Sequence, residues 1–453
     1  MLSRLARLVG LSKSRRPQPR RNFRPLLDRL EERAMMATFT VDDSFAGDNV
    51  ARRQYDTIQE AVDAARPGDT VLVKPGTYTG SVEVNKERLT VKAQSDADQF
   101  GRRPQNTSYV EVGAGEAYGF SVLANKVTIR GFQVMDNGDD GASPVGVVLS
   151  RATSGHQILN NSIQSLTFGI SLNTNGAFAT TIKGNTIVGN NQEGAAAGNG
   201  IYSDQGFSNV QIVANNFGGH LNASIIVVGG NTPGNLQSRL SITSNKMRDD
   251  GAIILANLTQ SQVVGNNIVN PNGTGIFLAG GNRDVSIKSN TLVGDRIAAA
   301  NAQVDPRSFT GINVRFLPEF YNVIETNTRI SVVGNKVSLF GDGGIRLRDG
   351  ANFSLVQSNT VKDNGNAGGI TMEEANDNRI LSNTVTGNLG DGIFADALSA
   401  DNFISGNNST KNGALNPGTF YDLQDLSTGD RTAGTANTWT RNKAFRRNPA
   451  NLS

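Results

Sequence analysis

The clearest pattern in the chain is an alternation of aliphatic and polar positions that repeats about every 24 residues. In residues 332–407, each repeat has an aliphatic residue, two further residues, an Asn, one more residue and a second small or aliphatic side chain. A second phrase, Gly-Ile-x-Leu or a close variant, lies between the copies, as at Gly344 and Gly369. A fixed period of this length predicts stacked supersecondary units, each too small to bury its own apolar face.

One Asn marks each repeat, and the aliphatic residues three before and two after it are expected to point inward. We expect the Asn to lie at a sharp bend, to tolerate left-handed dihedrals there, and to hydrogen-bond along a stacked column. The spacing stays near 24 residues except in a few places, and the 45 residues from Asn290 to Asn335 hold either an extra coil or a long loop. The positions are Asn161, Asn185, Asn215, Asn245, Asn266, Asn290, Asn335, Asn359, Asn383 and Asn407, with a last copy at Asn442.

The first part of the chain predicts a strand at residues 38–41, an amphipathic helix over residues 55–65 and a strand at residues 70–73. Ile58 and Val62 lie on one face of the helix, and Thr57 with Glu60 forms a capping-box pattern. Residues 89–91, 109–112 and 127–134 read as further strands.

The phrase Thr-Ile-Gln-Glu-Ala-Val-Asp-Ala-Ala at residues 57–65, followed by Pro-Gly-Asp-Thr-Val-Leu-Val-Lys-Pro-Gly-Thr-Tyr at residues 67–78, resembles the opening of pectate-lyase-like right-handed parallel β-helix proteins. The resemblance implies an all-β fold, a right-handed parallel β-helix of about a dozen coils with an N-terminal capping helix. We expect this single domain to span residues 38–445, with a tail at residues 446–453.

Residues 1–37 form a basic leader that we expect to be largely disordered. Its first 33 residues hold ten Arg or Lys and three acidic residues, so the rest of the chain is mildly acidic, and a nucleic-acid-binding body is not supported. The segment Leu30-Glu31-Glu32-Arg33 resembles the N-terminal sorting motif of planctomycete surface and secreted proteins; a plain basic arm is the alternative. This resemblance implies an extracellular or cell-surface location. We expect no membrane span, because no long apolar run follows the basic stretch.

Composition limits the chemistry that the chain can perform. Because there is no Cys, disulfide and thiolate chemistry are excluded. The two histidines, His156 and His220, are expected to have structural roles. Residues 136–141 have some calcium-loop character but read more simply as a turn, since Val147 stands where a bidentate Glu would be needed. We therefore expect no cofactor and no metal site, and calcium has no motif to support it.

The residues between the inward Ile and Leu of each Gly-Ile-x-Leu phrase should point outward and form two columns on the stacked coils. The first column holds the candidate substrate-binding residues Tyr202, Asn313, Arg346, Thr371 and Phe394. The second holds the candidate substrate-binding residues Asp204 and Arg315 and the candidate catalytic residues Arg348, Glu373 and Asp396.

If the second column is in register, Glu373 and Asp396 lie about 5 Å apart, one coil spacing. Two carboxylates this close do not both ionise easily, so one pKa should rise, which suits general acid and nucleophile or base roles in glycoside hydrolysis. Arg348 could instead neutralise a uronate during β-elimination, as the family resemblance suggests. The simpler alternative is an exposed ladder of ion pairs between neighbouring strands.

Two functions remain open from the sequence. The first is a β-helix that binds polysaccharide, either without cleaving it or as a lyase or a glycoside hydrolase. The second is a non-catalytic structural or adhesive surface protein. The Asp-Pro-His motif of β-helix mannuronan epimerases and the calcium-binding Asp cluster of pectate lyases are both absent, so the resemblance transfers no catalytic residue. The expected partner is a polysaccharide, not nucleic acid, and we expect a monomer.

Overall fold

The computed structural model describes residues 36–97, 106–113, 115–136, 143–230, 237–296, 310–321, 323–414 and 418–452. Apart from Met36, these residues belong to one compact unit, Ala37–Ser453. The sorting-type segment at residues 30–33 lies outside the described residues, as do residues 137–142 of the turn with calcium-loop character.

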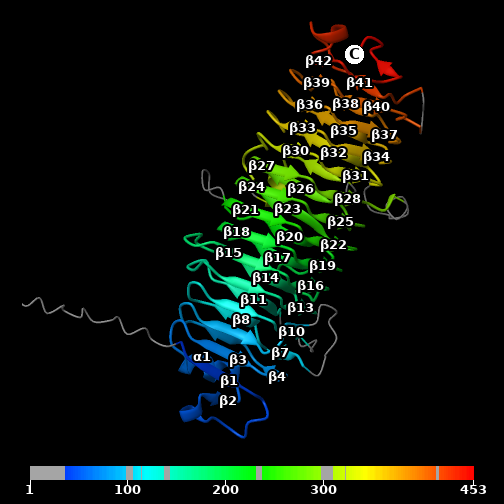
Figure 1. The fold of residues 1–453 in the computed structure, drawn as a ribbon. Coiled ribbons are helices and arrows are strands. Elements are labelled where there is room, and N and C mark those ends of the chain that lie inside the picture. Colours follow the sequence, from blue (N-terminus) through cyan, green and yellow to red (C-terminus); the bar gives the residue numbers. More distant parts are fainter. Residues whose placement is uncertain are drawn as a thin grey trace, which may run out of the picture. The chain divides into compact units, whose positions relative to one another are not determined.

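Successive coils of this unit contribute one strand to each of three sheets, sheets A and C have additional strands at the ends of the stack, and every pairing between the named strands is parallel. Figure 1 shows the strands of each sheet following one another along the stack in sequence order, except that β2 lies beyond β1 in sheet A. Sheet A contains β2 (Gln54–Tyr55), β1 (Thr38–Val41), β3 (Thr70–Val73), β6 (Thr90–Ala93), β9 (Thr128–Arg130), β12 (Gln157–Leu159), β15 (Thr180–Lys183), β18 (Ser208–Val213), β21 (Gln237–Thr243), β24 (Leu258–Val264), β27 (Arg283–Lys288), β30 (Ser331–Val333), β33 (Leu355–Gln357), β36 (Arg379–Leu381), β39 (Phe403–Ser405) and β42 (Thr438–Thr440).

The other two sheets follow the same order along the chain. Sheet B contains β4 (Gly76–Thr79), β7 (Ser108–Val112), β10 (Gln133–Asp136), β13 (Ser162–Gln164), β16 (Thr186–Val188), β19 (Asn216–Gly218), β22 (Lys246–Arg248), β25 (Asn267–Val269), β28 (Thr291–Val293), β31 (Lys336–Ser338), β34 (Thr360–Lys362), β37 (Thr384–Thr386) and β40 (Asn408–Thr410). Sheet C contains β5 (Val82–Val84), β8 (Tyr118–Val122), β11 (Val145–Leu149), β14 (Phe168–Leu172), β17 (Asn199–Ser203), β20 (Ala223–Val227), β23 (Ala252–Ala256), β26 (Ile276–Gly280), β29 (Ile312–Val314), β32 (Gly343–Arg348), β35 (Gly368–Glu373), β38 (Ile393–Ala395), β41 (Leu423–Asp425) and β43 (Arg447–Asn448).

The core is a set of aliphatic stacks inside the coils, as the repeat predicts. Ile158 and Ile163, which stand three before and two after Asn161, are both fully buried, and so are Ile345 and Leu347 of β32. Parallel in-register pairing places equivalent side chains of successive coils on top of one another. The predicted all-β parallel β-helix is therefore confirmed.

The marker Asn residues form a continuous buried ladder at the bend between sheets A and B. At each step, the backbone N–H and the Nδ2 of one Asn donate to the Oδ1 of the next, at 2.9 and 3.0 Å for Asn185 onto Asn215. The ladder runs to Asn442, which accepts from Asn407. From the sequence we expected the Asn itself to adopt left-handed dihedrals. In the structure the residue before it does so instead, such as Ala214 or Ser382.

The structure corrects two boundaries drawn from the sequence and decides one point that the sequence left open. Residues 127–134 are two strands, β9 and β10, because Gly131 turns the chain between them with a φ of +85°. The gap between Asn290 and Asn335 is one coil with long connections, since β27 pairs directly with β30 and β28 with β31. The tail from residue 446 is not free: β43 pairs with β41, and Leu452 is fully buried.

The amphipathic helix is present as α1 (Ile58–Ala64), shorter than residues 55–65 because β2 occupies Gln54 and Tyr55. Its N-cap Thr57 accepts from the Glu60 N–H, and the helix buries Ile58 and Val62 against β1, β2, β3 and β5. Among the described residues, the other helical segments are α3 (Pro318–Tyr321) and two single 3₁₀ turns, η1 (Val50–Arg52) and η3 (Thr432–Gly434). Within the part of the chain that the structure describes, no helix combines the length and apolar character needed to cross a bilayer.

Candidate functional site

The outward face of sheet C carries one side chain per coil in register, and we call this set the outer column. Its members from β11 to β41 are Val148, Ser171, Tyr202, Ile226, Ile254, Phe277, Asn313, Arg346, Thr371, Phe394 and Gln424. All five residues expected in the first column are in it. Asn313 and Arg346 are direct neighbours, because the long connections of that coil leave the strand register intact.

The first half of the outer column is apolar, which the sequence did not reveal. Ile226 and Ile254 point outward yet are 4% and 8% exposed, since they form a small cluster with Tyr202 and Phe277. The adjoining coils carry a second cluster that includes Val323. These two Ile positions were not predicted because β20 and β23 lack the Gly-Ile phrase, and each Ile stands beside a second Ile, so that polar and apolar positions do not alternate there.

In the second half of the outer column, Arg346 is the centre of a buried ionic network. Its guanidinium donates through Nε and Nη2 to Glu373 Oε1, at 3.0 and 2.6 Å, and through Nη1 to Asp342. Thr371 Oγ1 also donates to Glu373 Oε1, at 3.1 Å, and Thr310 donates to Asp342. Arg346 is only 6% exposed. In place of the exposed ladder of ion pairs that the sequence offered as an alternative, this part of the face is a network removed from water, in which each charge is stabilised by its partners.

Arg348 and Asn313 border this network and keep polar atoms without a partner. Arg348 Nε lies 3.1 Å from Glu373 Oε2, an ion-pair distance, but its N–H has no acceptor in line among the described residues. Asn313 is 6% exposed, and within the described ranges its Oδ1 accepts no hydrogen bond. Buried polar atoms in this condition usually meet a ligand or water.

The remaining second-column residues have structural partners. Arg315 donates to Asp349 Oδ2 at 2.8 Å. Asp396 accepts from the N–H groups of Glu374 and Leu398 and from Ser399 Oγ, so it organises the turn after β38. The carboxylates of Glu373 and Asp396 therefore bind different groups. These contacts do not bring the two carboxylates together as an acid and base pair.

Asp204, at the other end of the second column, is exposed and accepts from the Tyr202 hydroxyl at 3.4 Å. The Tyr202 ring lies 5.6 Å from the Phe168 ring, centroid to centroid. The outer column thus has half-buried aromatic rings at Tyr202, Phe277 and Phe394, with the polar residues between the last two.

Burial changes the protonation equilibria of this face. Desolvation raises the pKa of the Asp342 carboxyl above its usual value, although Arg346 acts in the opposite direction. Desolvation also lowers the pKa of the Arg348 guanidinium, and the neighbouring Arg346 adds to that effect. Perturbed groups gathered in one place are typical of functional sites and of structural ion networks alike.

A second buried acid, Asp391, lies at the C-terminal end of the outer column. Its Oδ1 accepts from the Tyr421 N–H at 2.6 Å, and the Gln424 amide, oriented so that both its polar atoms are satisfied, donates to Oδ2 at 2.8 Å. Burial raises the pKa of Asp391 to about 6. Neither Asp342 nor Asp391 is among the candidate site residues expected from the sequence. The signal shared by both is a Gly-Asp-Gly turn directly before a sheet C strand.

The two histidines are buried and structural, as expected. His220 Nδ1 lies 2.8 Å from Asp250 Oδ1, and Asp250 Oδ2 accepts from Ser224 Oγ at 2.7 Å. This Ser-Asp-His group is no nucleophile system, because the serine donates to the carboxylate and all three side chains are enclosed in the coil. His156 is fully buried beside Thr153, and desolvation lowers its pKa to about 4.

We expect His156 and Asp391 to give stability opposite dependences on pH. Between pH 4 and 6.5, His156 takes up a proton on unfolding, so its contribution to the free energy of unfolding rises with pH. Between pH 3.8 and about 6, Asp391 loses a proton on unfolding, so its contribution falls with pH. Each substitution removes one contribution and leaves the other. From pH 4 to 6 the free energy of unfolding should therefore fall by roughly 2–3 kcal/mol in His156→Gln and rise by a similar amount in Asp391→Asn. Urea denaturation at four pH values measures both slopes, and parallel curves for the two variants would contradict this assignment.

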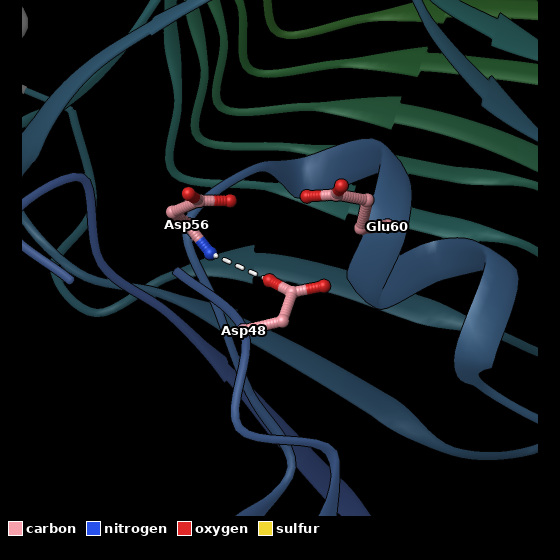
Figure 2. A group of neighbouring side chains, drawn as sticks. All are labelled: Asp48, Asp56 and Glu60. Atoms are coloured by element: carbon pink, nitrogen blue, oxygen red, sulfur yellow. Dashed lines mark hydrogen bonds between the residues drawn. The ribbon is translucent and has the colours of Figure 1, made fainter. Parts of the chain in front are cut away.

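Three carboxylates near the start of the chain could approach one cation. Oxygen atoms of Asp48, Asp56 and Glu60 all lie within 4.8 Å of one another. Figure 2 shows them around the start of α1, with the Asp56 N–H directed at Asp48. Glu60 Oε2 already accepts from the Thr57 hydroxyl at 2.5 Å, and Asp48 and Glu60 are exposed. The group is therefore sufficiently explained as a hydrated loop and helix cap.

Comparison with known proteins agrees with this architecture. Residues 252–445 match the family described as "Right handed beta helix region", and residues 40–228 match a family described as "Protein of unknown function (DUF1565)". No curated protein matched significantly.

Several solved structures are similar at low sequence identity. They include DFA-IIIase from Arthrobacter chlorophenolicus A6 in complex with GF2, with 14% identity over 81% of this chain and 93% of that one and a TM-score of 0.49. The Azotobacter vinelandii mannuronan C-5 epimerase AlgE6 A-module has 11% identity over 85% and 93%, with a TM-score of 0.47. The Dettilon tailspike protein (gp208) has 12% identity and a TM-score of 0.44; the match covers 85% of this chain but only 62% of the tailspike. With the three parallel sheets and the family match to residues 252–445, the fold is a right-handed parallel β-helix.

Proposed function

We propose that this protein binds a polysaccharide along the outer column of sheet C. The observation that carries the proposal is a pair of buried atoms on the adjacent strands β29 and β32. Asn313 Oδ1 accepts no hydrogen bond among the described residues, and the Arg348 Nε–H has no acceptor in line there, although Nε lies 3.1 Å from Glu373 Oε2. One accepts and the other donates, which matches sugar hydroxyls, since each hydroxyl does both.

The surroundings of these two atoms suit sugar rings. Phe277 precedes Asn313 in the outer column and Phe394 follows Thr371, so half-buried aromatic rings stand on both sides of the polar segment. An apolar ring face combined with a few convergent polar groups is the usual composition of a site for a polar organic ligand. The proteins named above as similar in fold include an epimerase of mannuronan, and we extend carbohydrate recognition to this chain as part of the proposal.

Within this proposal the candidate residues have distinct roles. Asn313 and Arg348 contact the glycan, and Tyr202 and Phe394 offer ring faces. Arg346, Thr371 and Glu373 position Arg348, because Glu373 binds both guanidinium groups and the Thr371 hydroxyl. Asp204 and Arg315 lie at the margin of the face, and Asp396 shapes a turn.

A glycan panel tests binding. We expect one acidic or neutral polysaccharide to bind wild type, and Asn313→Ala and Arg348→Met to weaken that binding at least ~10-fold, the loss of about 1.4 kcal/mol. Arg379→Met, on the exposed face of β36, is the matched control and should bind like wild type. Circular dichroism confirms that each variant is folded. Absence of binding to every glycan, or equal binding by all four proteins, would rule the proposal out.

Cleavage is a second candidate function, favoured by Asp391. A carboxyl whose pKa lies near 6 holds a proton close to neutral pH, as a general acid must. Reducing-end and unsaturated-uronate assays on the bound glycan measure it, and any turnover should be lost in Asp391→Asn. Binding with no turnover would leave the protein as a binding module.

We also infer that the chain acts at the cell surface or outside the cell, on the basis of the resemblance of residues 30–33 to a sorting motif. Fractionation of cells that produce the full chain, or residues 38–453 alone, tests this. An identical distribution of both forms would contradict it.

A further inference from the structure

A cavity of ≈ 320 Å³ lies at the corner where the chain passes from sheet C to sheet A, apart from the outer column. It is bordered by residues that follow β11, β14 and β17 and by the beginning of β18 and β21. The residues that the argument uses are Arg151, Gln205, Phe207, Ser208 and Gln237. The volume is at the small end of the range for ligand sites, so it suits a molecule of one or two sugar rings.

The floor of the cavity contains a buried acceptor without a donor. Gln237 is 3% exposed, and its Nε2 donates to the carbonyl oxygens of Gly229 and Ala256, at 2.7 and 3.4 Å. These bonds fix the orientation of the amide, so Oε1 is the atom left over. Among the described residues it accepts no hydrogen bond. Leaving such an atom unpaired costs about 1–3 kcal/mol, which a hydroxyl from a ligand would recover.

The rim of the cavity contains a free cation. Arg151 is exposed, and within the described ranges its guanidinium forms no ion pair or hydrogen bond. By contrast, Arg315, which directly follows β29 of sheet C, is paired with Asp349. A guanidinium that is free to make two parallel hydrogen bonds is suited to a carboxylate or a phosphate.

The cavity walls are close-packed backbone, which gives them a defined shape. A Cβ on Gly229 would lie 2.6 Å from the backbone nitrogen of Gly206, so the two chain segments meet there without room for a side chain. Phe207 is 5% exposed and closes the floor, while Ser208 Oγ shares a hydrogen bond with Ser238 Oγ at 2.9 Å.

We propose that this corner cavity binds a small hydroxylated anion of monosaccharide size, a sugar acid or a sugar phosphate. Arg151 holds the anionic group at the rim, and Gln237 Oε1 accepts a hydroxyl of the same molecule at the floor. The proposal is independent of polysaccharide binding at the outer column, since the two sites share no residue.

Calorimetric titration of the full chain with glucuronate, glucose 6-phosphate and glucose tests the proposal. We expect at least one anion to bind at least ~10-fold more tightly than glucose, and Arg151→Met to remove that difference. The two anions distinguish a carboxylate site from a phosphate site. Arg248→Met removes the same charge from an exposed position on β22, in sheet B, and should bind like wild type.

Arg151 is exposed, so its replacement leaves the core intact, whereas Gln237→Met also removes two structural hydrogen bonds and requires a folding check. In folded Gln237→Met all three ligands should bind more weakly. No binding of either anion at about 50 mM, equal binding of glucose and the anions, or unchanged anion binding in Arg151→Met would each overturn the proposal. Because no polysaccharide is used, a negative result would not bear on the function assigned to the outer column.

Discussion

Replacement of Asn266 by alanine is expected to lower the free energy of unfolding by about 3–5 kcal/mol, one of the two largest effects expected of a single substitution in this chain. The side chain accepts from the backbone N–H and the Nδ2 of Asn245 and donates to Ile242 O, Val264 O and Asn290 Oδ1. Alanine removes all five bonds and leaves buried backbone groups without partners, each costing about 1–3 kcal/mol.

The adjacent residue provides a matched control. Asn267 is exposed on β25, and none of the described residues hydrogen-bonds its side chain. Asn267→Ala should therefore change stability by no more than about 0.5 kcal/mol.

Amide hydrogen exchange locates the effect, because the Asn245 N–H loses its acceptor in Asn266→Ala only. Each coil contacts only its neighbours, so protection should fall first in the coils on either side of the substitution. Equal losses of stability in the two variants would show that the ladder contributes nothing beyond the loss of any polar side chain.

Replacement of Arg346 by methionine should cost about 3–5 kcal/mol. Methionine fills much of the volume but leaves the Asp342 carboxylate without its guanidinium and Glu373 with Arg348 alone, and the side chains of the two acids are only 9% and 23% exposed. Uncompensated buried charge is the cause of the loss, so neutral partners should reduce it.

Two comparisons separate this cause from loss of packing. The triple variant Asp342→Asn, Arg346→Met, Glu373→Gln removes all three charges and should recover at least half of the lost stability. Arg130→Met breaks an exposed bidentate pair with Asp96, whose bonds are 2.8 and 2.9 Å, and should cost less than about 1 kcal/mol. If the triple variant were no more stable than Arg346→Met, the charge argument would fail.

Much of the fold was predictable from the sequence because one residue per coil performs one physical task. An Asn in each bend satisfies buried backbone groups of the preceding coil, so any other residue is costly there and the spacing survives in the chain. The column from Tyr202 to Phe394 was found in the same way, since a period-two strand with buried Ile and Leu leaves only one set of outward positions.

The unpredicted parts depend on long-range burial. Ile226 and Ile254 read as ordinary core residues, because nothing local tells an outward Ile in a cluster from an inward one. Asp342 and Asp391 stand in Gly-rich turns, where acids are common, and only the coils packed around them make them buried. Asp396 follows the strand pattern but lies beyond the end of β38, so its side chain turns to the backbone of the preceding coil.

The ladder also has a consequence for how proteins of this kind diverge. The coil between Asn290 and Asn335 carries 45 residues from one Asn to the next, yet its two ladder bonds measure 2.9 and 3.0 Å, the same as in the 24-residue step from Asn161 to Asn185. The distance between coils is thus set by backbone and amide geometry and is insensitive to the length of the connections. Insertions can accumulate beside the face of sheet C without disturbing the strands beneath, which allows new specificities to evolve there while the scaffold stays constant.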